Sequence, residues 1–142
     1  MVRALELARL GEAEGEVPVG AVVTQDGTIV GEAYNRPRAL NDPTAHAEVL
    51  AIRAAAAALG SERLEGCDLW VTLEPCAMCA GAIVHARIAR LYYGASDPKG
   101  GGVDSGVRFF AQPTCHHAPE VYSAVGESEA ASLLREFFKA RR

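Results

Sequence analysis

The 142-residue sequence contains no long hydrophobic run. A transmembrane helix needs roughly 18 or more consecutive apolar residues, and no stretch of this chain is that long. The segment 54–59 is apolar but short, and Arg53 directly precedes it. Near the N-terminus, Arg3, Glu6 and Arg9 follow one another at helical spacing, without the continuous apolar segment of a signal peptide. We therefore expect a cytoplasmic protein that does not enter a membrane.

Cysteine is also scarce, with four residues in the chain. Two of them form a Cys-x-x-Cys pair, and the other two, Cys67 and Cys115, are isolated. A chain of this length can bury an adequate core without disulfide bonds, so the disulfide framework of a small secreted domain is not expected. Apolar residues make up 49% and charged residues 23%, with no internal repeat, and this composition predicts one globular domain over residues 1–142.

Positive charge is low overall but concentrated at one end. The net charge of −4 argues against non-specific binding of nucleic acid. In the last eight residues, however, four basic side chains stand against the single acidic Glu136, which leaves a local charge of +3. These basic residues are Arg135, Lys139, Arg141 and Arg142. A local basic patch of this kind favours contact with a phosphate backbone.

Hydrophobic periodicity predicts a series of helices and strands. Asp26-Gly27, between two Val-rich or Ile-containing segments, is a strong signal for a hairpin turn. Asp42 or Thr44 is expected to cap the second helix, with Pro43 in its first turn. The predicted helices span 2–14, about 45–59, 75–86 and a segment from about 127 onward; the predicted strands span 17–24, 28–34, 67–73 and 88–93, and the predicted loops 35–43 and 95–106.

The order of these elements predicts an α/β fold. Strand–helix–strand units imply parallel pairing, whereas the hairpin implies an antiparallel edge. Together they predict a mixed central sheet with helices on both faces, which is a three-layer α/β/α architecture.

Two short motifs carry the candidate chemistry, His46-Ala47-Glu48 and Pro75-Cys76-Ala77-Met78-Cys79. They supply one imidazole and two thiolates, and three protein ligands leave the fourth position of a zinc ion open for catalysis. Soft sulfur and nitrogen ligands favour zinc over hard cations. Glu48 is not needed as a ligand and is free to transfer protons. In this order the residues match the signature of zinc deaminases that act on nucleobases, in which zinc activates water.

The predicted helices explain how side chains from two separate segments could reach one metal ion. Cys76 and Cys79 are three residues apart on a predicted first turn, so both sulfurs can face the same ion. The partial positive charge of a helix N-terminus favours the thiolate form. His46 is expected in the first turn of its own helix. Glu48 would take a proton from water, deliver it to a ring nitrogen of the substrate, and later protonate the leaving amine.

Simpler interpretations of these motifs remain open. A Cys-x-x-Cys pair also occurs in redox proteins and in structural zinc sites. A structural zinc site needs a fourth ligand, and the isolated candidates for it are Cys67, Cys115, His116 and His117. A redox pair would leave His46 and Glu48 unexplained.

Further segments carry a resemblance over nearly the whole chain. They are Glu-Val-Pro-Val-Gly-Ala-Val at 16–22, Asn-Arg-Pro at 35–37, Asp-Pro-Thr-Ala-His-Ala-Glu at 42–48, Val71 to Ala82, Tyr93 to Lys99 and the terminal residues 137–142. With these segments the chain resembles the bacterial tRNA adenosine deaminases, within the cytidine deaminase-like superfamily.

The resemblance implies the cytidine deaminase-like fold and deamination of the wobble adenosine of a tRNA anticodon stem-loop to inosine. It implies one Zn²⁺ per subunit, held by His46, Cys76 and Cys79, with Glu48 as the catalytic proton carrier. The flipped base would be held by the side chain of Asn35 and the backbone N–H of Ala47. The family is homodimeric, so a homodimer is expected here.

One loop departs from the family pattern. The family commonly has Thr-Gly-Ala-Ala-Gly-Ser after the lysine that matches Lys99, whereas this chain has Gly-Gly-Gly-Val-Asp-Ser at 100–105. If the loop approaches RNA, Asp104 would repel phosphate. Of Phe137 and Phe138, we expect one ring to pack in the core and the other to form a lid over the pocket. The expected RNA contacts are Arg36, Lys99, Phe138, Lys139, Arg141 and Arg142.

Two other functions stay open at this point. The same zinc chemistry serves a deaminase of a free nucleobase or nucleoside, such as guanine or cytosine, and the net negative charge suits such a substrate. A non-catalytic zinc-stabilised RNA-binding module is the third hypothesis, but it gives Glu48 no role. A closed pocket would favour a small substrate, and an open groove lined with basic residues would favour RNA.

Overall fold

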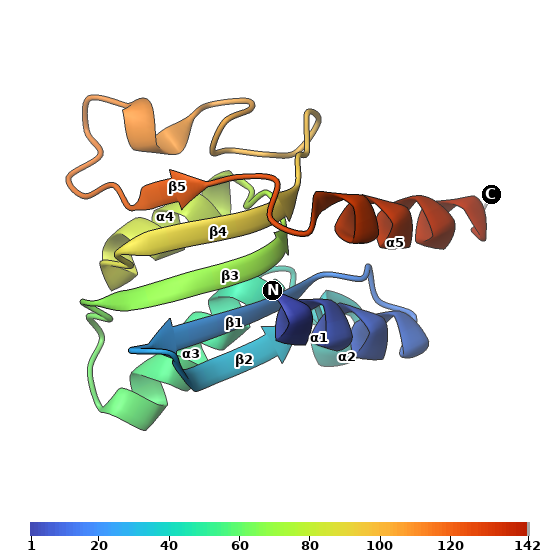
Figure 1. Cartoon of the computed structure of the whole chain (residues 1–142), viewed down its shortest axis with the longest axis horizontal. Helices are drawn as coiled ribbons and strands as arrows, with labels where there is room; N and C mark the ends of the chain where they lie inside the picture. Colours follow the sequence, from blue (N-terminus) through green and yellow to red (C-terminus); the bar gives the residue numbers. More distant parts are fainter. Residues whose placement is uncertain (142) are drawn as a thin grey trace.

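The computed structural model describes residues 1–141 and contains a five-stranded sheet with the strand order β2-β1-β3-β4-β5. Helices α1 and α5 pack on one face of the sheet, and α3 and α4 lie on the other (Figure 1). The elements are α1 (Val2–Ala13), β1 (Gly20–Gln25), β2 (Thr28–Tyr34), α2 (Pro37–Leu40), α3 (Ala47–Leu59), β3 (Cys67–Leu73), α4 (Ala77–Ala86), β4 (Arg90–Ala95), the 3₁₀ helix η1 (Phe109–Ala111), β5 (Glu120–Tyr122) and α5 (Glu127–Lys139). The predicted α/β/α architecture is confirmed.

The sheet is mixed, as the order of elements predicted. Strand β1 pairs antiparallel with both β2 and β3, and β4 pairs parallel with β3 and β5. The hairpin turn falls at Asp26-Gly27, and α4 makes the crossover between β3 and β4. The carboxyl ends of β3 and β4 therefore meet at one end of the sheet, beside the amino end of β1.

The core is divided by the sheet into two layers. Along β3, the alternate residues Cys67, Leu69 and Val71 are buried in the cluster that includes α3 and α4 side chains. Trp70 belongs to the opposite face, where it packs with Ala4 and Leu7 of α1. The period of two in β3 thus supplies apolar side chains to both helical layers.

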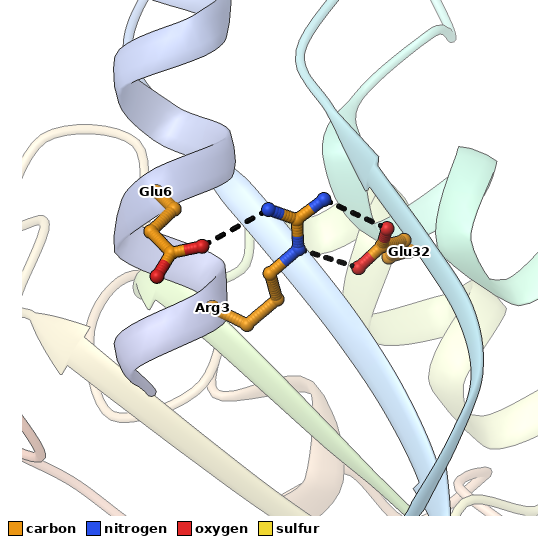
Figure 2. Close-up of polar contacts among 3 residues, drawn as sticks. All are labelled: Arg3, Glu6 and Glu32. Carbon is orange, nitrogen blue, oxygen red and sulfur yellow. Dashed lines mark hydrogen bonds and ion pairs between the residues drawn. The ribbon is translucent and has the colours of Figure 1, made fainter.

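A bidentate ion pair attaches α1 to the edge of the sheet (Figure 2). The guanidinium of Arg3 donates to both carboxylate oxygens of Glu32 on β2, at 2.8 and 2.9 Å, and to Glu6 at 3.0 Å. Beneath it, Leu5 and Leu7 are buried. The helix is therefore held by apolar packing with a polar link at its first turn.

Several boundaries differ from the sequence predictions. Strand β1 begins at Gly20 rather than at residue 17, because Val19 N–H closes a local turn onto the carbonyl of Val17. The predicted loop 35–43 contains α2, because the buried carboxylate of Glu16 accepts the N–H groups of Arg38 and Ala39. Strand β5 was not predicted, since it has only three residues.

None of the helices within residues 1–141 is long and apolar enough to span a membrane. Arg142, which was expected to contact RNA, lies outside the described residues.

Candidate functional site

The side chains of His46, Cys76 and Cys79 converge at the end of the sheet where β3 stops. Nδ1 of His46 lies 3.7 Å from Sγ of Cys76 and 3.5 Å from Sγ of Cys79, and all three ligand atoms lie within 4.8 Å of one another. Tetrahedral zinc with ordinary Zn–N and Zn–S bonds requires nitrogen and sulfur ligands about 3.6 Å apart. The three residues therefore fit one zinc ion.

No other metal-binding cluster of His, Cys, Asp and Glu side chains occurs among residues 1–141. The isolated candidates for a fourth ligand lie elsewhere. Cys67 is buried in the core, while the thiol of Cys115 donates to the carbonyl of His117 and the ring of His117 contacts the carbonyl of Ile88. The donor set is thus that of an open zinc site with three protein ligands.

His46 and Cys76 each occupy the position just before a helix. Both have extended backbone conformations, and their carbonyls accept the first helical hydrogen bonds, from Leu50 and Ala80. The prediction that both lie inside the first turn was wrong by one residue. The predicted cap of α3 was also wrong, because Asp42 accepts the N–H and hydroxyl of Thr44 and forms a separate turn.

The hydrogen bond between the two thiols of the cluster shifts their pKa values in opposite directions. Hydrogen bonds from Cys79 and then from His46 lower the pKa of Cys76 to about 4. The bond to Cys76, together with burial, raises the pKa of Cys79. The cluster therefore already favours one thiolate, and binding of a soft cation displaces the remaining thiol proton.

Glu48 lies in the first turn of α3, and its residue is only 4% exposed. Burial raises the pKa of this carboxyl to about 7, with smaller opposing effects from hydrogen bonds and from His46. A carboxyl with this pKa can both accept and donate a proton near neutral pH.

His46, Cys76 and Glu48 line a cavity of about 280 Å³. This is just below the range of about 300–1,000 Å³ that small-molecule sites occupy. Its walls combine aliphatic side chains with a few polar groups. The lining residues are Val17, Val19, Asn35, His46, Glu48, Leu73, Glu74, Cys76, Asp97 and Gly100. A cavity of this size and composition suits a flat, polar-edged ring such as a nucleobase.

Asn35 lines this cavity, and its side chain bonds to the backbone of Ala47. The Ala47 N–H donates to the Asn35 Oδ1 at 3.2 Å. Because this bond uses the Oδ1 atom of Asn35, the amide nitrogen is the end of the side chain that can bond to other groups. The expected contacts of both groups with a base remain predictions, and a base that uses the Ala47 N–H must displace the Asn35 carbonyl.

Two acidic residues that line the cavity, Glu74 and Asp97, were not predicted to lie there. Burial raises the pKa of Glu74, but hydrogen bonds from the N–H groups of Asp97, Ser105 and Val103 and from the Ser105 hydroxyl outweigh burial and leave this pKa lowered. The only signal in the sequence was the position of Glu74 between an apolar strand and Pro75. Its hydrogen-bond donors lie 23 or more residues further along the chain, too far for local patterns to reveal.

A groove of about 720 Å³ adjoins the cavity. Lys99, Phe138 and Arg141 line it, and Val17, Leu73 and Asp97 line both the groove and the cavity. Phe137 is buried, which confirms the core packing predicted for one of the two rings, whereas Phe138 is 48% exposed and lines the groove. The lid expected of the second ring stays a prediction.

Arg141 is held in place at this groove. Its guanidinium carbon lies 3.5 Å from the centre of the Phe137 ring, and the guanidinium donates to the Phe137 carbonyl. The structure therefore brings three of the predicted RNA contacts, Lys99, Phe138 and Arg141, to the groove beside the cavity that His46 and Cys76 line.

The other predicted RNA contacts lie elsewhere. Arg36 approaches Glu14 at 3.9 Å and stands over the ring of Tyr34, and Lys139 lines a separate hollow on the other side of Phe138. Asp104 accepts the hydroxyl of Tyr93 and lines neither the cavity nor the groove. The expected repulsion between Asp104 and phosphate thus has no basis at the groove.

Comparisons with known proteins agree with this geometry. Residues 1–95 match the cytidine and deoxycytidylate deaminase zinc-binding region. A tRNA-specific adenosine deaminase of Agrobacterium fabrum is 62% identical over 142 residues, covering all of this chain and 93% of the relative. One from Haemophilus influenzae is 49% identical, covering 98% of this chain and 81% of that protein.

A solved structure from work on A-to-I editing by tRNA:A34 deaminases at the wobble position of transfer RNA superposes with a TM-score of 0.91. It is 63% identical and covers 92% of this chain and 95% of that chain. The similarity therefore extends over fold and sequence together.

Proposed function

The chain belongs to the tRNA-specific adenosine deaminases, which carry the zinc-binding region of the cytidine and deoxycytidylate deaminases, and we propose that it hydrolyses adenosine to inosine at the wobble position of a tRNA anticodon. One observation supports this most directly. A cavity that contains a zinc-binding donor set and a buried carboxyl opens into a groove lined by basic and aromatic side chains.

His46, Cys76 and Cys79 would hold the zinc ion, which supplies a Lewis acid that makes water acidic enough to ionise near neutral pH. The two helices that begin at His46 and Cys76 place these side chains before the substrate arrives. Their N-terminal N–H groups offset the negative charge that two thiolates bring.

Glu48 moves the protons of the reaction. Its carboxylate takes a proton from the attacking water and delivers it to the ring nitrogen beside the reacting carbon. In the second half the carboxylate takes the proton of the hydroxyl group that has been added to this carbon and passes it to the amine, which leaves as ammonia. Glu48 is almost fully buried, and its pKa of about 7 suits both directions of transfer.

The groove accounts for an RNA substrate rather than a free base. Lys99 and Arg141 carry charges that can pair with phosphates on either side of a flipped nucleotide, and the exposed ring of Phe138 can stack on a neighbouring base. Lys139, Arg36 and Arg142 would add contacts further from the cavity.

We further propose that residues 1–142 form a single deaminase domain, since helices from both ends of the chain pack on one sheet. The resemblance supports a homodimer and a cytoplasmic location.

Met78, between the two cysteines that would bind zinc, is 39% exposed and offers an apolar surface on which a second subunit could pack next to the site. Light scattering of the purified protein measures the oligomeric state directly.

Inosine formation and ammonia release from purified zinc-loaded protein test the proposed activity. One reaction contains an arginine-tRNA anticodon stem-loop with adenosine at the wobble position. The other contains free guanine, cytosine, adenine and their nucleosides, and Glu48→Gln protein serves as the control for contaminating deaminases. We expect conversion of the RNA alone.

Conversion of a free base alone would keep the zinc chemistry and reject the tRNA substrate. Binding of the stem-loop without any conversion by the wild-type protein would instead support a non-catalytic RNA-binding module.

A further inference from the structure

The carboxylate of Glu74 accepts hydrogen bonds from both ends of the loop 97–105. Its Oε1 accepts the N–H of Asp97 and the hydroxyl of Ser105, both at 3.0 Å. Its Oε2 accepts the N–H groups of Val103, Asp104 and Ser105 at 3.2, 3.0 and 2.9 Å. The residue is 2% exposed, so these hydrogen bonds form away from water, where a missing partner is costly.

The middle of the loop lies directly against the segment that carries the zinc ligands. The N–H of Gly102 donates to the carbonyl of Pro75 at 2.8 Å. A Cβ atom on Gly101 would lie 2.5 Å from Cδ of Glu74, and one on Gly102 would lie 2.7 Å from the backbone nitrogen of Ala77. Only glycine allows this approach, so the loop backbone is packed onto the junction of β3 and α4.

The same loop forms part of the substrate site. Asp97 and Gly100 line the cavity beside Glu48, and Lys99 lines the adjoining groove. A shift of the loop would therefore move the wall of the cavity and a phosphate contact together.

We propose that Glu74 is a positioning residue for deamination, whose carboxylate holds the loop 97–105 in the shape that encloses the base and presents Lys99 to the RNA. This inference rests on the proposed function. A carboxylate offers about four lone-pair sites, and five donors already occupy those of Glu74. Although Glu74 lines the cavity, it therefore has no acceptor left for the substrate and acts through the loop.

Steady-state kinetics with zinc-loaded Glu74→Gln protein test this role. The substituted amide keeps the size of the side chain but replaces one acceptor oxygen with a donor, so it cannot accept all five hydrogen bonds. We expect the KM for the stem-loop to rise about tenfold, because loss of preorganised geometry weakens productive binding. The zinc content should stay at the wild-type value. Ser105→Ala, which removes one donor, should raise KM by a smaller factor.

A destabilised control separates positioning from general stability. Ile88→Ala opens a cavity in the core near the other end of β4, away from the loop, and should lower the melting temperature without changing KM. An equal rise of KM in this control would overturn the proposal, as would a wild-type KM in Glu74→Gln protein.

Hydrogen exchange measures the loop without using the reaction. The amides of Asp97 and of residues 103–105 should exchange faster in Glu74→Gln protein than in wild type. If the wild-type protein converts no RNA, the proposed function fails, but this exchange experiment still decides on the loop. Unchanged exchange at these amides would overturn the proposal in either case.

Discussion

Glu48 shows how much of this site depends on the surroundings of a single side chain. It follows His46 by two residues on the same chain segment, yet it is buried in a cavity beside the metal cluster rather than part of that cluster. Burial keeps its pKa near neutrality, whereas an exposed glutamate would be fully ionised at pH 7. The protonation of this carboxyl is thus set by its position as well as by its residue type.

Glu48→Gln should abolish most of the activity while leaving the metal site intact. General acid–base groups contribute about 10²- to 10⁴-fold to rate, and we expect a loss of kcat in that range. The measurement is inosine formation from the stem-loop, with zinc content and the circular dichroism spectrum as controls. Activity within threefold of wild type would contradict the role of Glu48 in proton transfer.

The convergence of His46, Cys76 and Cys79 could be predicted from the sequence, because the residue types and the Cys-x-x-Cys spacing point to one shared metal ion. Cys76 and Cys79 are three residues apart, and a helix start brings both to one side. The bond between the Ala47 N–H and Asn35 could not be predicted, since it joins groups 12 residues apart across a turn whose shape was unknown. The hydrogen bonds of Glu74 escaped prediction for the same reason.

At the level of elements, α5 connects the sheet to the groove beside the candidate zinc site. Its buried residue Ala130 packs with Ala95 of β4 and Leu5 of α1. Its last turn carries Phe138 to the groove, and Arg141 follows just after the end of the helix. The apolar stripe of this helix was visible in the sequence. Its position beside Lys99 was not, because it depends on the sheet order.

Replacing both Lys99 and Arg141 by alanine should weaken stem-loop binding and reduce its dependence on salt. Each lost phosphate contact should lower the slope of log affinity against log salt by about 0.7–0.9. Fluorescence anisotropy at several salt concentrations measures this slope. Arg63→Ala, which removes an exposed charge just before β3, at the end of that strand away from the cavity, is the matched control and should leave the slope unchanged.

The ion pair between Arg3 and Glu32 predicts a pH dependence for the docking of α1. The hydrogen bond from Arg3 lowers the pKa of Glu32 from its ordinary value of 4.5. The stabilisation is therefore complete above about pH 4.5 and is lost as pH falls through the lowered pKa.

Glu32→Gln should lower the melting temperature at pH 7 by about 2 °C, a small shift because the pair is partly exposed to solvent. The difference from wild type should close below pH 4.5. Melting curves between pH 3 and 7 would reveal it, and a constant difference over that range would refute the link.

Element boundaries were predictable where side-chain patterns were long and regular. Strand β3 matches its predicted range from Cys67 to Leu73, since its seven residues form a predominantly apolar run between turn signals. Strand β5 has three residues after a long irregular segment, and only Val121 among them is aliphatic. Nothing in so short a stretch distinguishes a strand from a loop before the edge of β4 is known.

For the whole molecule, the zinc site joins parts of the chain that are far apart in sequence. His46 precedes α3 and Cys76 precedes α4, and these helices form one layer of the core. A ligand that binds only the folded state stabilises it by mass action. Zinc should therefore act on the stability of the entire fold and not only on the site.

Removal of zinc by a chelator should lower the melting temperature by about 10 °C, as expected for a stabilisation of about 3–4 kcal/mol in a domain of this size. Differential scanning calorimetry of zinc-loaded and chelated protein measures the shift. Cys76→Ser protein should melt at the lower temperature in both conditions. A chelator-induced shift of wild-type size in this variant would remove Cys76 from the ligand set.

The arrangement of α1 and α5 has a practical consequence for handling the protein. The two helices lie on the same face of the sheet, but the amino end of the chain starts over the middle of the sheet while α5 carries the carboxyl end beyond it, alongside the groove (Figure 1). An affinity tag or fluorescent protein attached after residue 142 would be tethered close to the groove that we propose binds RNA. Purification handles and fusion partners therefore belong at the amino end.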